Sequence, residues 1–383
     1  MQNAEDVKKR PSHYALVEPI QMKYFLIFIE TLIMSTLLYL PAYAEIKVIE
    51  ADSNYIIGDN DTKVDARRIA TQEAKRKALE LAGTYVESLT QVKNYQLTKD
   101  EVKLYTAGVL ETEVVSEQMR GTTDHPEIYI KTRCKIDTAA LMTQIDRYRE
   151  NEDLKEQLDA SARENEDLRK ERDGLVKQLA AEKDKEKAAE TRKQLDTVLT
   201  KEEANDETHK VWINIGPQLV QADETDREIR QSDLDNASVV LQRSIKNNPK
   251  NLRARLLLAA VYQRKGNTAA AETELRTAIE HNPSNPAPRM RLGILLREKK
   301  SYEEALQEFH FVEKIRPHNP MMLFYTGMTL KDMGRCGRAV HYLQRFLKDP
   351  RIAKFPKKKE QAVQAIDGCG GVRGEHQRRG RNR

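Results

Sequence analysis

The sequence predicts a multidomain protein with a small α+β domain, then a long charged helix or coiled coil, and then an all-α solenoid. Three patterns carry this prediction. Residues 61–83 show helical periodicity and residues 128–136 show strand periodicity. A five-residue unit recurs within 141–199 at an offset of two heptads. Prolines recur every 34 residues from position 249 to position 317, a spacing typical of helical repeats.

The composition favours long helices. Of the 383 residues, 33% are charged and only 6% are aromatic, which argues against a single large enzyme domain. The 16 glycines and 13 prolines are few for this length, so turn-rich β structure is disfavoured. A net charge of +5 does not by itself indicate a polyanionic partner. Three cysteines exclude a disulfide-dense domain.

Residues 1–44 are predicted to be an N-terminal extension and a signal peptide, the latter covering 22–44 with Met22 as the true start. Thr31–Leu40 is an apolar run followed by a small-x-small cleavage pattern that ends at Ala44. The alternative is an uncleaved anchor, although Glu30 interrupts the apolar stretch. Export predicts a periplasmic protein without a nucleic-acid partner.

Residues 45–140 are predicted to form the small α+β domain. A stripe of mostly small residues lies at helical spacing between Asp61 and Gly83, and Gly83 is expected to end this helix. Residues 128–136 alternate between apolar and charged side chains, as in a half-buried strand. Val114–Met119 is its expected antiparallel neighbour, with Gly121–Pro126 as the connection. The helical stripe consists of Ala66, Ile69, Ala70, Ala74, Ala78, Leu81 and Ala82.

This domain resembles the N-terminal domain of flagellar assembly protein T. The resemblance rests on Asp65–Ala70, on the alanines up to Gly83, on Val86–Ser88 with Asn94, on Glu113–Glu117 and on Tyr129–Asp137. It covers about a quarter of the chain and implies a periplasmic assembly or interaction role. The rest of the chain departs from that protein, so the resemblance does not imply flagella.

Residues 141–200 are predicted to be a charged helix or coiled coil. The units Glu150–Leu154 and Glu164–Leu168 repeat each other. One interpretation is a coiled-coil seam through which chains self-associate, and the other is a single solvated helix that spaces its neighbours apart. The seam would have Asn151, Leu158, Asn165, Arg172 and Leu179 at a and Leu154, Ser161, Leu168 and Leu175 at d.

Residues 236–350 show the pattern of tetratricopeptide repeats. Ala237, Ala271, Ala305 and Ala339 recur at the same 34-residue period as the prolines, and so do Leu241, Leu275, Phe309 and Leu343. Ala259, Gly293 and Gly327 mark the close approach of the two helices in each repeat. Residues 201–235 are assigned to a linker and a degenerate repeat start, 351–367 to a capping helix and 368–383 to a disordered basic tail.

The sequence contains no motif that supports catalysis. It lacks a phosphate-binding G-x-x-x-x-G-K-[ST] loop, an H-E-x-x-H pair and a G-x-S-x-G turn. The acidic cluster Glu164–Asp167 is interpreted as a solvated helix face rather than a metal site. We therefore expect no enzyme, no metal and no cofactor.

The resemblance to tetratricopeptide domains implies a groove for a protein or peptide partner along the first helices of the repeats. Its columns are apolar with basic ends, and Met290 and Met328 are expected in the groove rather than in the core. The middle column lacks the asparagines of a carboxylate clamp. Successive repeats contribute Leu256, Ala260 and Gln263, then Met290, Ile294 and Arg297, then Phe324, Met328 and Lys331.

The three cysteines have different predicted roles. Cys134 shares the inward face of its strand with Ile130 and Ile136, so we expect a buried thiol. Cys336 lies at the turn of the last repeat and Cys369 follows the capping helix. Both are expected at the same end of the solenoid, where geometry permits a disulfide.

Two functional hypotheses follow. The first is an exported envelope scaffold that binds a polypeptide in its repeat groove and docks through the α+β domain. The second is a structural protein held at the membrane or cell wall by an uncleaved anchor or by the arginines of its tail. Those arginines are Arg373, Arg378, Arg379, Arg381 and Arg383.

Overall fold

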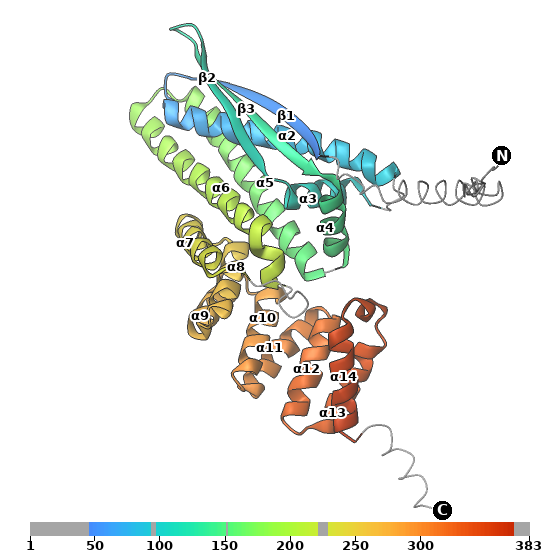
Figure 1. Cartoon of the computed structure of the whole chain (residues 1–383). Coiled ribbons are helices and arrows are strands. Elements are labelled where there is room, and N and C mark those ends of the chain that lie inside the picture. The colour runs from blue at the N-terminus through green and yellow to red at the C-terminus, as the bar shows by residue number, and fades with distance from the viewer. Residues whose placement is uncertain (1–45, 93–96, 151, 221–228, 371–383) are drawn as a thin grey trace, which may run out of the picture. The chain divides into compact units, whose positions relative to one another are not determined.

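The computed structural model describes residues 46–92, 97–150, 152–220 and 229–370 (Figure 1). The predicted signal peptide and cleavage site lie outside these residues, and so do Asn94, Asn151 and the tail arginines. Within the described residues, no helix is long and apolar enough to cross a membrane.

A three-stranded antiparallel sheet opens the described chain. Its strands β1 (Ile46–Ile56), β2 (Thr112–Gly121) and β3 (Pro126–Asp137) lie in the order β1-β3-β2. The predicted pairing of β2 with β3 is confirmed, with a bulge between Val114 and Ser116. The sequence did not indicate β1. The inward side chains of β3 are fully buried as predicted: Ile128, Ile130, Thr132, Cys134 and Ile136.

Helix α2 (Lys63–Val92) packs against β1 and β3 through small residues, which permit close approach to the sheet. The Thr132 hydroxyl donates to the carbonyl of Ala74 in this helix at 3.0 Å. The helix does not end at Gly83 as expected, because the buried stripe continues to Val86. The buried alanines of α2 are Ala66, Ala70, Ala74, Ala78 and Ala82. A short helix that was not predicted, α3 (Lys99–Val109), begins with a capping box of Thr98 and Glu101.

Three helices follow the sheet: α4 (Thr138–Glu150), α5 (Glu152–Ala181) and α6 (Lys185–Val220). The prediction of one long spacing helix is wrong, since the chain reverses at residues 182–184 and α6 runs back along α5. Asn60 fixes the reversal by donating from Nδ2 to the carbonyls of Leu179 and Glu182 at 2.9 and 2.8 Å. Residues 201–220, expected as a linker, continue α6.

The heptad seam faces this second helix within the same chain. Asn165 accepts from Asn205 Nδ2 of α6 at 2.7 Å, and Arg172 pairs with Glu202 of α6 at 3.1 Å. The polar insertions in the seam therefore find polar partners on α6. Self-association through this seam would displace intramolecular packing. The buried residues of the heptad seam include Leu158, Leu168, Arg172, Leu175 and Leu179.

The remaining helices form the repeat array. Helix α7 (Gln231–Asn247) follows α6 and packs on it. Three helix pairs come next: α8 (Leu252–Arg264) with α9 (Thr268–His281), α10 (Pro286–Glu298) with α11 (Tyr302–Ile315), and α12 (Pro320–Asp332) with α13 (Cys336–Leu347). A 3₁₀ turn (Pro350–Lys354) and α14 (Pro356–Gly368) close the array against α13 and α12.

Candidate functional site

Asparagines set the start of each first helix in the repeats. Asn251, Asn285 and Asn319 are 34 residues apart, and each side chain accepts a hydrogen bond from a backbone N–H of α8, α10 or α12. This cap satisfies one of the amide groups that a helix leaves unpaired at its N-terminus. The first helices therefore begin at equivalent points and present equivalent residues along one face.

Glycine is required where the two helices of a repeat meet. A Cβ atom at Gly293 would lie 2.5 Å from Phe309, and one at Gly327 would lie 2.6 Å from Leu343. Phe309 and Leu343 occupy the same repeat position in the second helix of their repeats, and both are buried. The predicted close approach at these two glycines is confirmed.

A repeated ion pair joins the helices of the first two complete repeats. Arg255 Nη1 lies 2.7 Å from Glu274 Oε2, and Arg289 Nη1 lies 3.0 Å from Glu308 Oε2 at positions shifted by one repeat. The third repeat has Leu323 and Tyr342 at these positions. These pairs were not predicted, although the 34-residue repeat already brings an Arg of the first helix and a Glu of the second to equivalent positions in both repeats.

The first column of the predicted groove belongs to the core. Leu256, Met290 and Phe324 are 0%, 4% and 3% exposed and pack in the apolar cluster of the repeats. Phe324 packs on Phe346, with ring centroids 5.3 Å apart. Their assignment to a partner-binding surface is therefore wrong, because the adjoining helices cover them.

The other two columns retain access in the second and third repeats. Ile294 and Met328 are half-buried at equivalent positions of α10 and α12, whereas Ala260 is buried. Gln263, Arg297 and Lys331 are also partly exposed. The accessible part of the predicted groove is thus an apolar pair with cationic neighbours, and we call Ile294, Met328, Arg297 and Lys331 the α10/α12 face.

The charges of the α10/α12 face are already anchored. Arg297 Nη2 lies 2.6 Å from Asp332 Oδ2, which links α10 to α12. Lys331 Nζ lies 4.0 Å from the other oxygen of the same carboxylate. One carboxylate therefore faces two cations, so this end of the face stays cationic.

Helix α6 adjoins the first complete repeat. The Arg253 guanidinium stacks on the buried Trp212 ring, 4.5 Å from its centroid, and Arg264 donates to the carbonyl of Gln218 at 3.0 Å. These contacts occupy cationic groups of α8. Ala260 of α8 is buried in the same apolar cluster as Trp212 and Ile215 of α6, whereas the equivalent residues Ile294 and Met328 of the later repeats are half-buried.

Cys336 and Cys369 are joined by a disulfide, with their Cα atoms 5.2 Å apart. The bond ties the end of α14 to the start of α13. Cys134 is a free buried thiol, and burial raises its pKa to about 11. Such a thiol stays protonated and unreactive at neutral pH.

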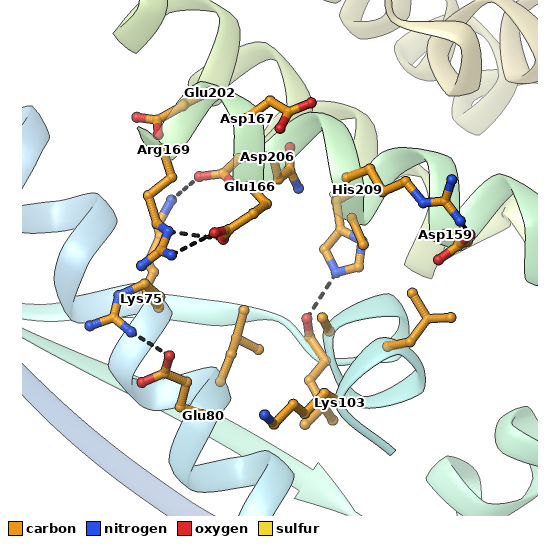
Figure 2. Close-up of a pocket in the computed structure, with 18 of the residues that line it drawn as sticks. Lys75, Glu80, Lys103, Asp159, Glu166, Asp167, Arg169, Glu202, Asp206 and His209 are labelled. Atoms are coloured by element: carbon orange, nitrogen blue, oxygen red, sulfur yellow. Dashed lines mark hydrogen bonds and ion pairs between the residues drawn. The ribbon is translucent and has the colours of Figure 1, made fainter. Parts of the chain in front are cut away.

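A cavity of about 1220 Å³ lies among α2, α3, α5 and α6 (Figure 2). Leu79, Leu104 and Ala107 contribute apolar surface to it. His209 contacts the carbonyl of Leu110 through Nε2 at 2.9 Å, and burial lowers the pKa of His209 to about 4. The His209 ring is therefore neutral at pH 7. Its Nε2 carries the hydrogen and donates to the carbonyl of Leu110.

Ion pairs within the chain line this cavity. Arg169 pairs with Glu166 at 2.7 Å, and Lys155 pairs with Glu101 at 2.7 Å. Glu166 belongs to the acidic cluster that the sequence placed on a solvated face. In the described part of the chain, no group of three or more His, Cys, Asp or Glu side chains is arranged to hold a metal ion. No sequence pattern indicated this cavity, because its walls come mainly from four helices that are separated in the sequence.

Comparison with known families identifies the repeats. Residues 228–290 match the family model of the tetratricopeptide repeat. This part of the chain is therefore similar to tetratricopeptide repeats. The matched residues span α7, α8 and α9 and the start of α10, so the repeat begins before the first complete helix pair.

Several solved structures are similar to the chain at low identity. MamA is 16% identical over 37% of this chain and 81% of its own, with a TM-score of 0.33. A MamA fragment from Desulfovibrio magneticus is 14% identical over 43% and 93%, with a TM-score of 0.32. PilF of Pseudomonas aeruginosa is 21% identical over 43% and 78%, with a TM-score of 0.32. No curated protein sequence matches the chain.

Proposed function

We propose that the chain is an exported envelope scaffold that binds a polypeptide on the α10/α12 face. The observation that carries this proposal is the half-buried pair Ile294 and Met328 at equivalent positions of successive first helices. Repeat arrays bind extended partners along such faces. Half-buried apolar side chains leave area that a partner can cover, which supplies the driving force for association.

The partner chemistry follows from the charges beside this pair. Arg297 and Lys331 outnumber Asp332, so a segment with apolar side chains and at least one carboxylate matches the face. Met328 has an unbranched flexible side chain, which adapts to partners of varied shape.

The export signal and the docking role of the α+β domain complete the proposal. The signal at 22–44 supports periplasmic location, and the resemblance of residues 45–140 to the flagellar assembly protein T domain supports attachment to an envelope component. We expect assembly of a complex rather than catalysis.

Capture from a periplasmic extract tests the proposal. The wild-type chain is compared with Ile294→Asp/Met328→Asp, which places carboxylates on the α10/α12 face. The matched control is Val239→Asp, because Val239 is 64% exposed on α7 and away from that face. We expect a captured polypeptide to be lost with the double variant and retained with the control. Equal capture by all three chains would contradict the proposed binding face.

A further inference from the structure

Strand β2 has an uncovered edge, and α2 covers its inner side only in part. The sheet order leaves β2 with a single neighbour, and α2 packs mainly on β1 and β3. Val114 and Met119 lie on the inner side because they face the inward residues Thr132 and Ile128 of β3. They are nevertheless 45% and 52% exposed. An edge strand with exposed apolar residues is a template for pairing with another strand.

The β2 sequence is complementary to itself in an antiparallel register. We propose that two copies of this chain associate by pairing their β2 strands about a two-fold axis at Glu117. In this register Glu113 faces Arg120 of the other copy and Val114 faces Met119 of the other copy. Val115 is the bulged residue that has no partner in β3, and the register omits it.

Side-chain directions agree with this register. Glu113 points outward, since it lies 3.1 Å from Lys135 on the outer side of the sheet. Arg120 also points outward, since its guanidinium lies 3.4 Å from the centroid of the Tyr129 ring. Paired residues of antiparallel strands share a face, so the opposite charges meet on one side and the apolar pairs on the other.

One interaction at the centre of the paired strands opposes association. The two Glu117 side chains face each other on the inner side, where like charges oppose association. Each Glu117 already accepts a hydrogen bond from Arg67 of α2 at 2.6 Å. This ion pair offsets the negative charge of each carboxylate and so reduces the repulsion between them. Two α2 helices then flank a trough in which Val114 and Met119 of both copies cover one another. The result is a six-stranded sheet with no exposed β2 edge.

Charge reversal tests this register with the full chain in sedimentation velocity. Glu113→Arg alone and Arg120→Glu alone each place like charges opposite one another, and each should raise the dimer dissociation constant by about tenfold or more. The double variant should restore association. A mixture of the two single variants should also associate, because position 113 of each chain again faces an opposite charge at position 120 of the other. Asp52→Arg on β1 is the control and should leave the constant unchanged.

A thiol at the two-fold axis gives an independent readout. Glu117→Cys should form an interchain disulfide under mild oxidation, because position 117 faces itself across Cβ atoms about 5 Å apart. Asp52→Cys should not. A chain that remains monomeric up to ~100 µM, a mixture of single variants that does not associate, or equal cross-linking at positions 52 and 117 would overturn the proposal.

Discussion

Asn251 donates from Nδ2 to Oδ1 of Asn205 at 2.8 Å, so the cap of α8 is held by a side chain from α6. Asn205 also accepts from Asn248 at 3.0 Å and donates to Asn165 of α5 at 2.7 Å. Asn205, Asn248 and Asn251 are buried, and the network connects the hairpin of α5 and α6 to the start of the complete repeats. Buried polar groups that are mutually satisfied specify one packing, whereas leaving one unpaired is costly.

Asn205→Ala should lower the free energy of unfolding by about 1–3 kcal/mol, because it removes the acceptor that Asn248 and Asn251 share and the donor to Asn165. Urea unfolding measures this loss. A double-mutant cycle with Asn251→Ala should show coupling, and one with the remote cap variant Asn319→Ala should be additive. Additivity in both cycles would show that the network does not hold the cap.

Glu202 should make stability depend on pH. Burial raises the pKa of Glu202 to about 7, although Arg172 beside it acts in the opposite direction. The folded chain then retains a proton that the unfolded chain releases, so the free energy of unfolding falls as pH rises from about 4.5 to about 7. Glu202→Gln removes this term and keeps an acceptor for Arg172. Denaturation at several pH values should show the variant gaining stability relative to wild type as pH rises, and a constant difference would contradict the raised pKa.

The core position of Phe324 predicts a large effect of truncation. Phe324→Ala should lower the free energy of unfolding by about 3–5 kcal/mol, because the adjoining helices leave a cavity around the missing ring. Met328→Ala, one turn further along α12 and half-buried, should cost clearly less. Chemical denaturation of both variants provides the comparison, and equal losses would place Phe324 outside the core.

The disulfide should stabilise the end of the array. Cys336→Ser/Cys369→Ser should lower stability by about 3–4 kcal/mol in the chain-entropy model for a separation of 33 residues. Alkylation without reduction, followed by mass spectrometry of the wild-type chain, should leave both thiols unlabelled. Labelling at both positions in protein purified from an oxidising compartment would reject the bond.

Strand β3 and the helical repeats could be predicted because their residues follow a regular period in the sequence. The alternation in β3 and the 34-residue spacing of the repeats each reflect a single element packing one face, so they are visible in the sequence. Strand β1 was missed because the charged residues Glu50 and Asp52 obscure its inward set, which includes Ala51 and Ser53.

The partner of the heptad seam and the burial of the groove residues could not be predicted, because both depend on packing between helices. The heptad pattern of α5 identified a seam but not its partner, and α6 supplies that partner after the reversal at 182–184. The spacing of the predicted groove residues did not distinguish buried Met290 from half-buried Met328, because the burial of a side chain depends on the neighbouring helices as well as on its position in the repeat.

Site-specific photo-cross-linking tests whether the α10/α12 face binds a polypeptide. A photo-reactive amino acid replaces Ile294 or Met328 in the full chain, and exposed Val239 of α7 provides the control position. Positions 294 and 328 should cross-link one and the same polypeptide in the periplasm, and position 239 should not. Equal cross-linking at all three positions, or none at 294 and 328, would contradict the α10/α12 face as a polypeptide-binding site.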